Sequence, residues 1–126
     1  MSINFSDRPI LVIGDVMLDI YTRGISTRLS PEAPVPIVGI QYSEYSLGGA
    51  ANVAANIKSL GGNPIVIGLV GEDNDGELTT EQLQNCNMSI AGVIKSARRT
   101  TVKNRVMVNR QQVVRLDTED VYPVSN

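Results

Sequence analysis

Two carboxylates follow the first apolar segment of the chain at a spacing that could serve a ligand. Residues 9–14 read PILVIG, and Asp15 and Asp19 come directly after them. In open α/β sheets, ligands bind beyond the carboxyl ends of the strands, and ionised carboxylates accept hydrogen bonds from vicinal hydroxyls. We therefore predict that Asp15 and Asp19 face a polyol. The alternative is that Asp15 only caps a turn and that Asp19 is only solvated.

A glycine pair precedes a segment with helical character. Gly48, Gly49 and Asn52 stand in the stretch GGAAN. Two glycines let the backbone approach a ligand, and the free amides at a helix start favour oxygen-rich groups. The Asn52 amide offers a donor and an acceptor, as sugar hydroxyls require. A tight turn without a ligand explains the same pattern.

Two cations lie close together in residues 101–109. If this segment is a strand, Lys103 and Arg105 share a face with Thr101 and Met107, while Val102, Val106 and Val108 lie around the other face. Such a pair can hold a phosphate, the arginine through its fork and the lysine as a point charge. The alternative is that the two cations protect an edge strand from pairing.

Composition narrows the class of protein. The 126 residues suffice for one compact domain, and with no histidine and one cysteine we expect no metal site and no disulfide. No apolar run approaches the ~20 residues of a membrane span, and the N-terminus does not resemble a secretory signal. We expect a cytoplasmic protein that binds neither membrane nor nucleic acid, the latter because the net charge is −2.

The positive charges are unevenly distributed along the chain. Seven of its 11 Lys and Arg residues lie in residues 95–115, which contain no acid. That stretch is either a solvated basic face or a surface for an anion.

Several familiar nucleotide and metal motifs are absent. The first apolar segment ends without G-x-G-x-x-G, and no GK[ST] occurs anywhere in the chain. The segment around Asp73, Asn74 and Asp75 lacks the bidentate ligand of a calcium loop, because Gln82 stands at the twelfth position.

The elements that would position these residues alternate between strand and helix. We predict a strand at 9–14 buried on both faces, because it is continuously apolar, and a loop-like stretch at 22–36. Asp73 or Asn74 is expected to cap the second helix. The remaining expected elements are an exposed strand at 35–42, helices at 50–60 and 75–86, and strands at 65–70, 93–94, 101–108 and 112–116. This order predicts parallel pairing with right-handed crossovers in an α/β three-layer arrangement.

Longer motifs resemble the ribokinase-like (PfkB) carbohydrate kinases. The family's N-terminal signature fits residues 48–54, GGAANVA, with Gly61 and Gly71 at the expected offsets. Residues 14–19, GDVMLD, and 28–36, RLSPEAPVP, together with KNRV at 103–106 and RQQ at 110–112, look like heptose 7-phosphate kinases, including the kinase half of the bifunctional heptose kinase/ADP-heptose synthase. The resemblance runs from about Ile10 to Asp117.

The resemblance implies both a fold and an activity. It implies the N-terminal portion of a ribokinase-like three-layer α/β/α fold, across residues 1–126, with a small β-sheet lid from about 20–45 and 93–117. The activity would be ATP- and Mg²⁺-dependent transfer of phosphate to the anomeric hydroxyl of heptose 7-phosphate, in lipopolysaccharide core (ADP-heptose) biosynthesis. The family also implies a homodimer formed through the lid.

The same resemblance suggests roles for single residues. Asp19 and Asn52 correspond to sugar-hydroxyl contacts, and Gly48 and Gly49 to the backbone platform beside them. Charge favours Lys103 and Arg105 on the lid as ligands of the phosphate that the sugar already carries.

The family's Gly-Ala-Gly-Asp segment, with its general base and ATP pocket, does not occur in this sequence. We therefore expect no catalytic base here, and an N-terminal fragment that is inactive alone. A strand left unpaired at the sheet edge would favour self-association. The alternatives are a related kinase with another acceptor, of the ribokinase or fructokinase type, and a non-catalytic dimerisation module.

Overall fold

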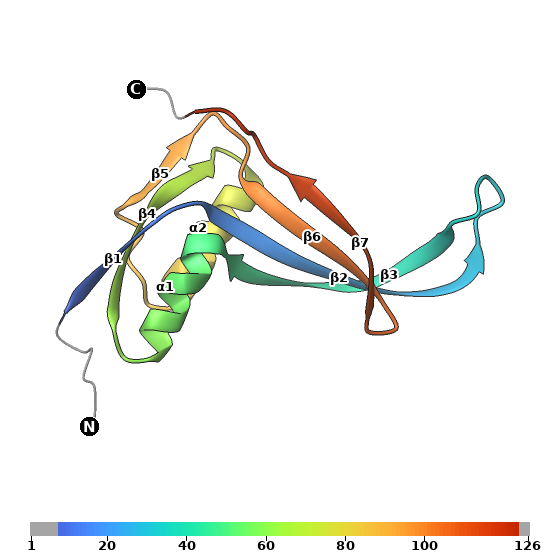
Figure 1. The fold of residues 1–126 in the computed structure, drawn as a ribbon, viewed down its shortest axis with the longest axis horizontal. Coiled ribbons are helices and arrows are strands. Elements are labelled where there is room, and N and C mark those ends of the chain that lie inside the picture. The colour runs from blue at the N-terminus through green and yellow to red at the C-terminus, as the bar shows by residue number, and fades with distance from the viewer. Residues whose placement is uncertain (1–7, 124–126) are drawn as a thin grey trace.

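A three-stranded parallel sheet forms the core of the computed structural model, which describes residues 8–123 (Figure 1). Its strand order is β1 (Pro9–Ile13), β4 (Asn63–Gly71) and β5 (Val93–Ser96). The helices α1 (Gly49–Ser59) and α2 (Asn74–Asn85) connect the strands. The alternation of strand and helix predicted this parallel pairing, and both helices start and end within one residue of the expected positions.

Both helices pack against one face of this sheet. In α1 the buried residues are Ala50, Ala51 and Ala54, whose small side chains let the helix approach the strands closely. These alanines share a core with Val66 of β4 and Leu83 of α2. The described residues thus form a helical layer and a strand layer of the expected three-layer fold.

The prediction that β1 is buried on both faces was wrong. Leu11 is 55% exposed and Ile13 is 69% exposed, because the side chains that alternate with the helix-facing ones have nothing packed over them. Ile65 of β4 and Ile94 of β5 are exposed as well. We call these four residues the open face of the core sheet.

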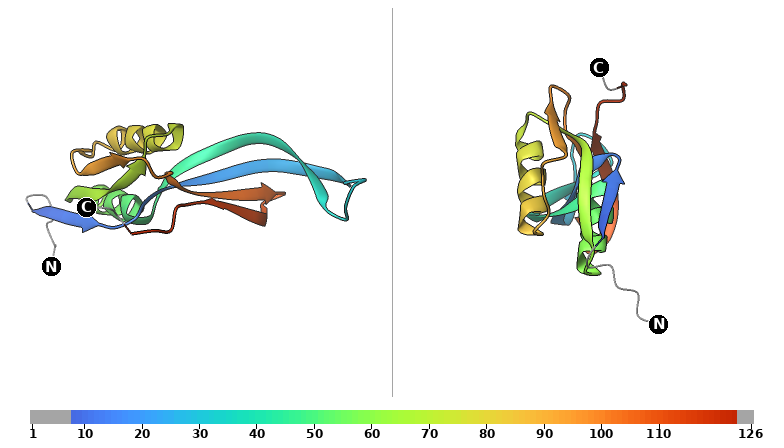
Figure 2. Two further views of the ribbon diagram at one scale, coloured as in Figure 1. Left: turned by 90° about the horizontal axis from the view of Figure 1, so that it is seen from above. Right: turned by 90° about the vertical axis from the view of Figure 1, so that its left-hand side faces the viewer.

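A second, four-stranded sheet extends away from the core, and we call it the lid (Figure 2). Its strand order is β3 (Pro36–Gly48), β2 (Val16–Leu29), β6 (Thr101–Val108) and β7 (Gln111–Thr118). β2 pairs antiparallel with β3 and parallel with β6, and β6 pairs antiparallel with β7. The stretch expected to be loop-like, 22–36, is strand as far as Leu29. Pairing with β3 outweighs the weak local signal there, because strand preference depends on neighbouring strands more than on the segment itself.

The lid differs from its expected bounds, about 20–45 and 93–117, in both segments. The first segment is longer, because β2 begins at Val16 and β3 ends at Gly48. β5 pairs with β4 in the core sheet, so the second lid segment begins at Thr101 rather than near residue 93. Within β6 the predicted alternation is confirmed, since Val102 and Val108 are buried while Lys103 and Arg105 lie on the opposite face.

Asp73 ties the root of the lid to the core. Its carboxylate accepts hydrogen bonds from the Gly76 N–H (2.8 Å), which caps α2, and from the hydroxyl (2.6 Å) and N–H (2.9 Å) of Thr100. The Thr100 hydroxyl in turn accepts from the Gly71 N–H (2.8 Å). Burial alone would raise the pKa of Asp73, but the three hydrogen bonds together lower it. This junction fixes where β6 leaves the core.

Candidate functional site

The turn from β1 into β2 lies against the start of α1. The Ala50 N–H donates to the carbonyl oxygen of Asp15 at 2.9 Å. Gly49 has a φ of +56°, and a Cβ at this position would overlap that same carbonyl oxygen. Asp15 and the glycine pair, which are far apart in the sequence, are therefore brought together.

Asp19 lies beside the other glycine of the pair. A Cβ on Gly48 would come within 3.0 Å of the Asp19 carboxyl carbon and of its Oδ2. The missing side chain leaves room for this carboxylate, whose side chain is 19% exposed. Asp15, Asp19, Gly48 and Gly49 thus lie at one junction of β1, β2, β3 and α1.

Asn52 lies in the first turn of α1 and is exposed. Within residues 8–123 its side chain makes no hydrogen bond. A contact to the same ligand as Asp19 therefore stays a prediction for this residue.

The two lid cations are already paired with carboxylates. Arg105 Nη1 donates to Asp19 Oδ1 at 2.8 Å, and Lys103 Nζ donates to Asp117 Oδ2 at 3.3 Å. The Arg105 guanidinium also lies 5.2 Å from the centre of the Tyr21 ring. The hydrogen bond that Arg105 donates to Asp19 raises the pKa of Arg105 further. Sequence reasoning missed these pairs because they depend on the register of β6 against β2 and β7.

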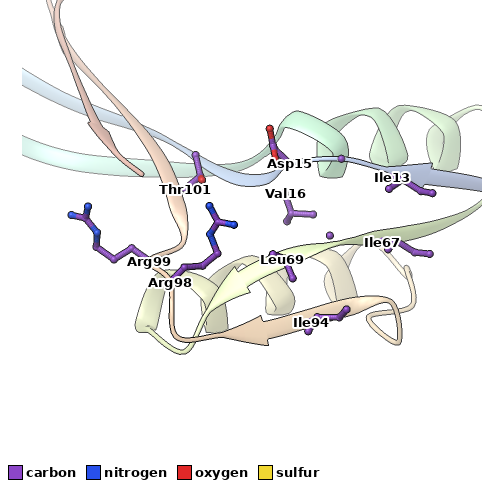
Figure 3. Close-up of a pocket in the computed structure, with 11 residues that line it drawn as sticks. Ile13, Asp15, Val16, Ile67, Leu69, Ile94, Arg98, Arg99 and Thr101 are labelled. Carbon is purple, nitrogen blue, oxygen red and sulfur yellow. The ribbon is translucent and has the colours of Figure 1, made fainter. Parts of the chain in front are cut away.

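A pocket of about 250 Å³ opens at the carboxyl ends of the core strands (Figure 3). Ile13, Ile67, Leu69 and Ile94 form its apolar wall, and both helices lie behind the strands in this view. Figure 3 shows the Arg98 side chain directed toward the Asp15 side of the pocket and Arg99 directed away from it. The pocket therefore has an apolar base and a charged rim.

Arg98 lies at the rim of this pocket, and the sequence alone did not single it out from the basic stretch 95–115. It donates to the backbone carbonyls of Asp120 and Tyr122 and lies 5.0 Å from the Tyr122 ring centre. Arg99, by contrast, forms an ion pair with the Asp120 carboxylate at 2.7 Å, and its hydrogen bonds lower the pKa of Asp120. Across the described ranges Arg98 forms no ion pair with a carboxylate, although its charge helps to lower the pKa of Asp120. Arg98 lines the pocket together with Asp15. The absence of acids from 95–115 was the one signal of this charged rim in the sequence.

The described part of the chain offers no group of three or more His, Cys, Asp or Glu side chains that could hold a metal ion. Among residues 8–123, no helix is long and apolar enough to cross a membrane.

Solved structures with the same arrangement include ribokinases and related carbohydrate and nucleoside kinases. The ribokinase of Arabidopsis thaliana, solved with ribose and ATP, superimposes with a TM-score of 0.69 at 23% identity, over 87% of this chain and 35% of that one. A carbohydrate kinase of Agrobacterium tumefaciens gives a TM-score of 0.61 at 26% identity, over 88% of this chain and 35% of that one. The core sheet with its lid is thus a ribokinase-like fold, as its motifs predicted.

The family follows from sequence. The model of the pfkB family of carbohydrate kinases matches residues 7–121, and the chain belongs to that family. It is 46% identical over 119 residues to the bifunctional protein HldE of Vibrio parahaemolyticus, and 47% identical over 119 residues to that of Helicobacter acinonychis. Each match covers 94% of this chain, and 25% or 26% of the relative. The chain therefore spans about a quarter of the length of these relatives.

Proposed function

We propose that this chain is the sugar-binding part of an ATP-dependent kinase that phosphorylates the anomeric hydroxyl of heptose 7-phosphate. The observation that carries the proposal is the 46% identity to a bifunctional HldE over 94% of the chain. Its motifs at 14–19, 28–36 and 103–112 resemble heptose 7-phosphate kinases. The reaction would then belong to ADP-heptose formation for the lipopolysaccharide core.

In this proposal, the junction of β1, β2, β3 and α1 binds the sugar ring. The carboxylate of Asp19 accepts hydrogen bonds from two hydroxyls, and the Asn52 amide supplies a donor and an acceptor. Gly48 and Gly49 let the backbone approach the ring, and Asp15 closes the site on the core side. The support is the close approach of Asp19 to Gly48 and of Asp15 to Gly49.

Lys103 and Arg105 bind the phosphate at the far end of the sugar. Both side chains lie on the same face of β6, and Arg105 on that face contacts Asp19. The side chains of Lys103 and Arg105 are each less than a quarter exposed. A partly desolvated cation holds a phosphate more strongly than a fully solvated one, because water screens the charge less.

ATP, Mg²⁺ and the general base belong, in this proposal, to parts of the kinase outside these 126 residues. Phosphoryl transfer depends on positioning and on charge stabilisation at the transferred group. The chain alone would therefore bind sugar without turnover. We further propose that the protein acts in the cytoplasm, where ATP is available, and as a homodimer through the lid.

A binding experiment tests this proposal. Calorimetric titration should show that the chain binds heptose 7-phosphate, and that it binds ribose and fructose more weakly. Asp19→Asn should weaken heptose 7-phosphate binding about 10- to 100-fold, since hydrogen bonds to a charged group are worth about 1.5–3 kcal/mol. Glu32→Gln, in the exposed turn between β2 and β3, is the matched control and should bind as the unmodified chain does.

Two results would contradict the proposal. One is equal affinity of the Asp19→Asn and Glu32→Gln variants for the sugar phosphate. The other is stronger binding of ribose or fructose than of heptose 7-phosphate, which would assign the chain to a kinase with another acceptor.

A further inference from the structure

Two neighbouring rows of side chains cross all four strands of the lid on one face. Strand register sets the members of each row opposite one another, and successive rows are two residues apart, or about 7 Å. The first row consists of Ser46, Asp19, Lys103 and Asp117. The second row consists of Glu44, Tyr21, Arg105 and Arg115. The cations already proposed to bind phosphate, one in each row, thus have a third cation as a neighbour.

Cations outnumber carboxylates on β2, β6 and β7 within these rows. Lys103, Arg105 and Arg115 face the two carboxylates Asp19 and Asp117. Asp117 serves two of the cations, with Arg115 Nε at 2.8 Å and Nη2 at 2.9 Å and with Lys103 Nζ at 3.3 Å. The hydrogen bonds from Arg115 lower the pKa of Asp117 below its usual range. The third carboxylate of the two rows, Glu44 on β3, is paired with Arg23 at 2.6 Å, outside the rows. Among Lys103, Arg105 and Arg115, one positive charge is therefore left without its own counter-ion.

The position of Arg115 is unfavourable unless an anion is shared. Arg105 and Arg115 lie directly opposite each other on β6 and β7, and like charges in such cross-strand pairs are destabilising. Arg115 uses Nε and Nη2 for Asp117, so its Nη1 is free among the residues the structure describes. Its side chain is 48% exposed, which leaves that nitrogen accessible to a ligand.

We propose that Arg115 is a third ligand of the substrate's far-end phosphate and determines the preference for a phosphorylated sugar. This inference rests on the proposed function, which assigns that phosphate to Lys103 and Arg105. A phosphate dianion has three terminal oxygens and can accept from three cations at once, and a guanidinium matches its geometry better than an ammonium does. Asp117 acts as a positioning residue, because its carboxylate orients the guanidinium plane of Arg115 and the ammonium group of Lys103.

A purely structural role for Arg115 makes a different prediction. If its ion pair with Asp117, which lies within β7, only held that carboxylate toward Lys103 of β6, removing Arg115 would change stability slightly, since exposed pairs contribute little. It would then leave the ligand preference unchanged. If Arg115 instead binds the phosphate, removing it should reduce the preference for the phosphorylated sugar.

The test compares two sugars on four proteins. Heptose 7-phosphate and unphosphorylated heptose are titrated into the unmodified chain and into the Arg115→Gln, Arg115→Lys and Arg28→Gln variants. Arg28→Gln is the matched control, because it removes the same charge from the far end of β2. Thermal unfolding of each variant shows that the fold is retained, and Arg115→Lys serves as the second variant if Arg115→Gln does not fold.

Arg115→Gln should lose about 10-fold or more of the preference for the phosphorylated sugar while its affinity for plain heptose stays the same. Arg115→Lys should recover part of the preference, and Arg28→Gln should keep all of it. The inference is overturned if the unmodified chain prefers the phosphorylated sugar and Arg115→Gln keeps the same preference as Arg28→Gln. If the unmodified chain shows no such preference, the proposed substrate is wrong, and this inference fails with it.

Discussion

At the scale of single residues, Gly49 is the position where backbone geometry shapes the site. Its positive φ and its contact with the Asp15 carbonyl set the start of α1 against the turn after β1. Gly61 also has a positive φ, +85°, but nothing lies within 4 Å of a Cβ built there. The two glycines therefore separate the cost of the backbone conformation from the cost of a steric clash.

Gly49→Ala should reduce the free energy of unfolding by about 3 kcal/mol or more, because both costs apply. Gly61→Ala should cost only about 1 kcal/mol, because only the left-handed conformation applies. Urea unfolding of the two variants measures the difference. Equal losses of unfolding free energy in both variants would show that a Cβ at position 49 causes no costly clash with the Asp15 carbonyl oxygen.

At the scale of elements, α1, α2 and the strands of the core could be predicted from the sequence, because their signals are local. The alanine-rich stretch before Gly61 and the capping residue Asp73 mark the helices, and apolar runs mark β1 and β4. The length of β2 could not be predicted, because residues 22–29 become strand only through pairing with β3. For the same reason the sequence could place Asp19 and Arg105 as candidate ligands but could not show that they pair with each other.

The contribution of Asp73 to the stability of the fold is expected to depend on pH. Its pKa is lowered in the fold, so its contribution to stability is present above the usual carboxyl pKa of ~3.9 and is lost as pH falls through the lower folded value. Asp73→Asn should cost about 1–3 kcal/mol at pH 7, since it weakens a helix cap and two bonds from Thr100. The difference from the unmodified chain should shrink below about pH 4. Urea unfolding between pH 2 and pH 7 measures it.

Asp75 provides the matched control for that experiment. Burial and the nearby charge of Asp73 raise its pKa, so the ionised form of Asp75 is disfavoured in the fold. Asp75→Asn should therefore become more stable relative to the unmodified chain as pH rises from 3 to 7, the opposite trend. The same trend in both variants would contradict the role assigned to the Asp73 hydrogen bonds.

At the scale of the whole molecule, two exposed apolar surfaces could carry the proposed dimer. One is the open face of the core sheet, and the other is the outer part of the lid, where Ile40 of β3 is 68% exposed. Exposed apolar patches of this kind favour association. The proposed homodimer uses the lid, and the nearly equal exposure of Ile40 and of Ile13, at 69%, allows a matched comparison.

Ile40→Asp should weaken dimerisation about 10-fold or more, because it would bury a charge in the lid interface. Ile13→Asp should leave dimerisation unchanged. Sedimentation over a 100-fold range of concentration measures both. If Ile13→Asp dissociates the dimer and Ile40→Asp does not, the chain associates through its core sheet instead.

Because β2 lies between β3 and β6, the lid sheet cannot be completed until β6 has been synthesised. Asp19 and Arg105 are 86 residues apart, so at about 5–20 residues per second a ribosome needs roughly 4–17 s to supply β6 after β2 has been synthesised. During that interval the hairpin of β2 and β3 has an unpaired edge that can join strands of other nascent chains. Chaperone binding to the emerging hairpin would therefore raise the yield of correctly folded protein.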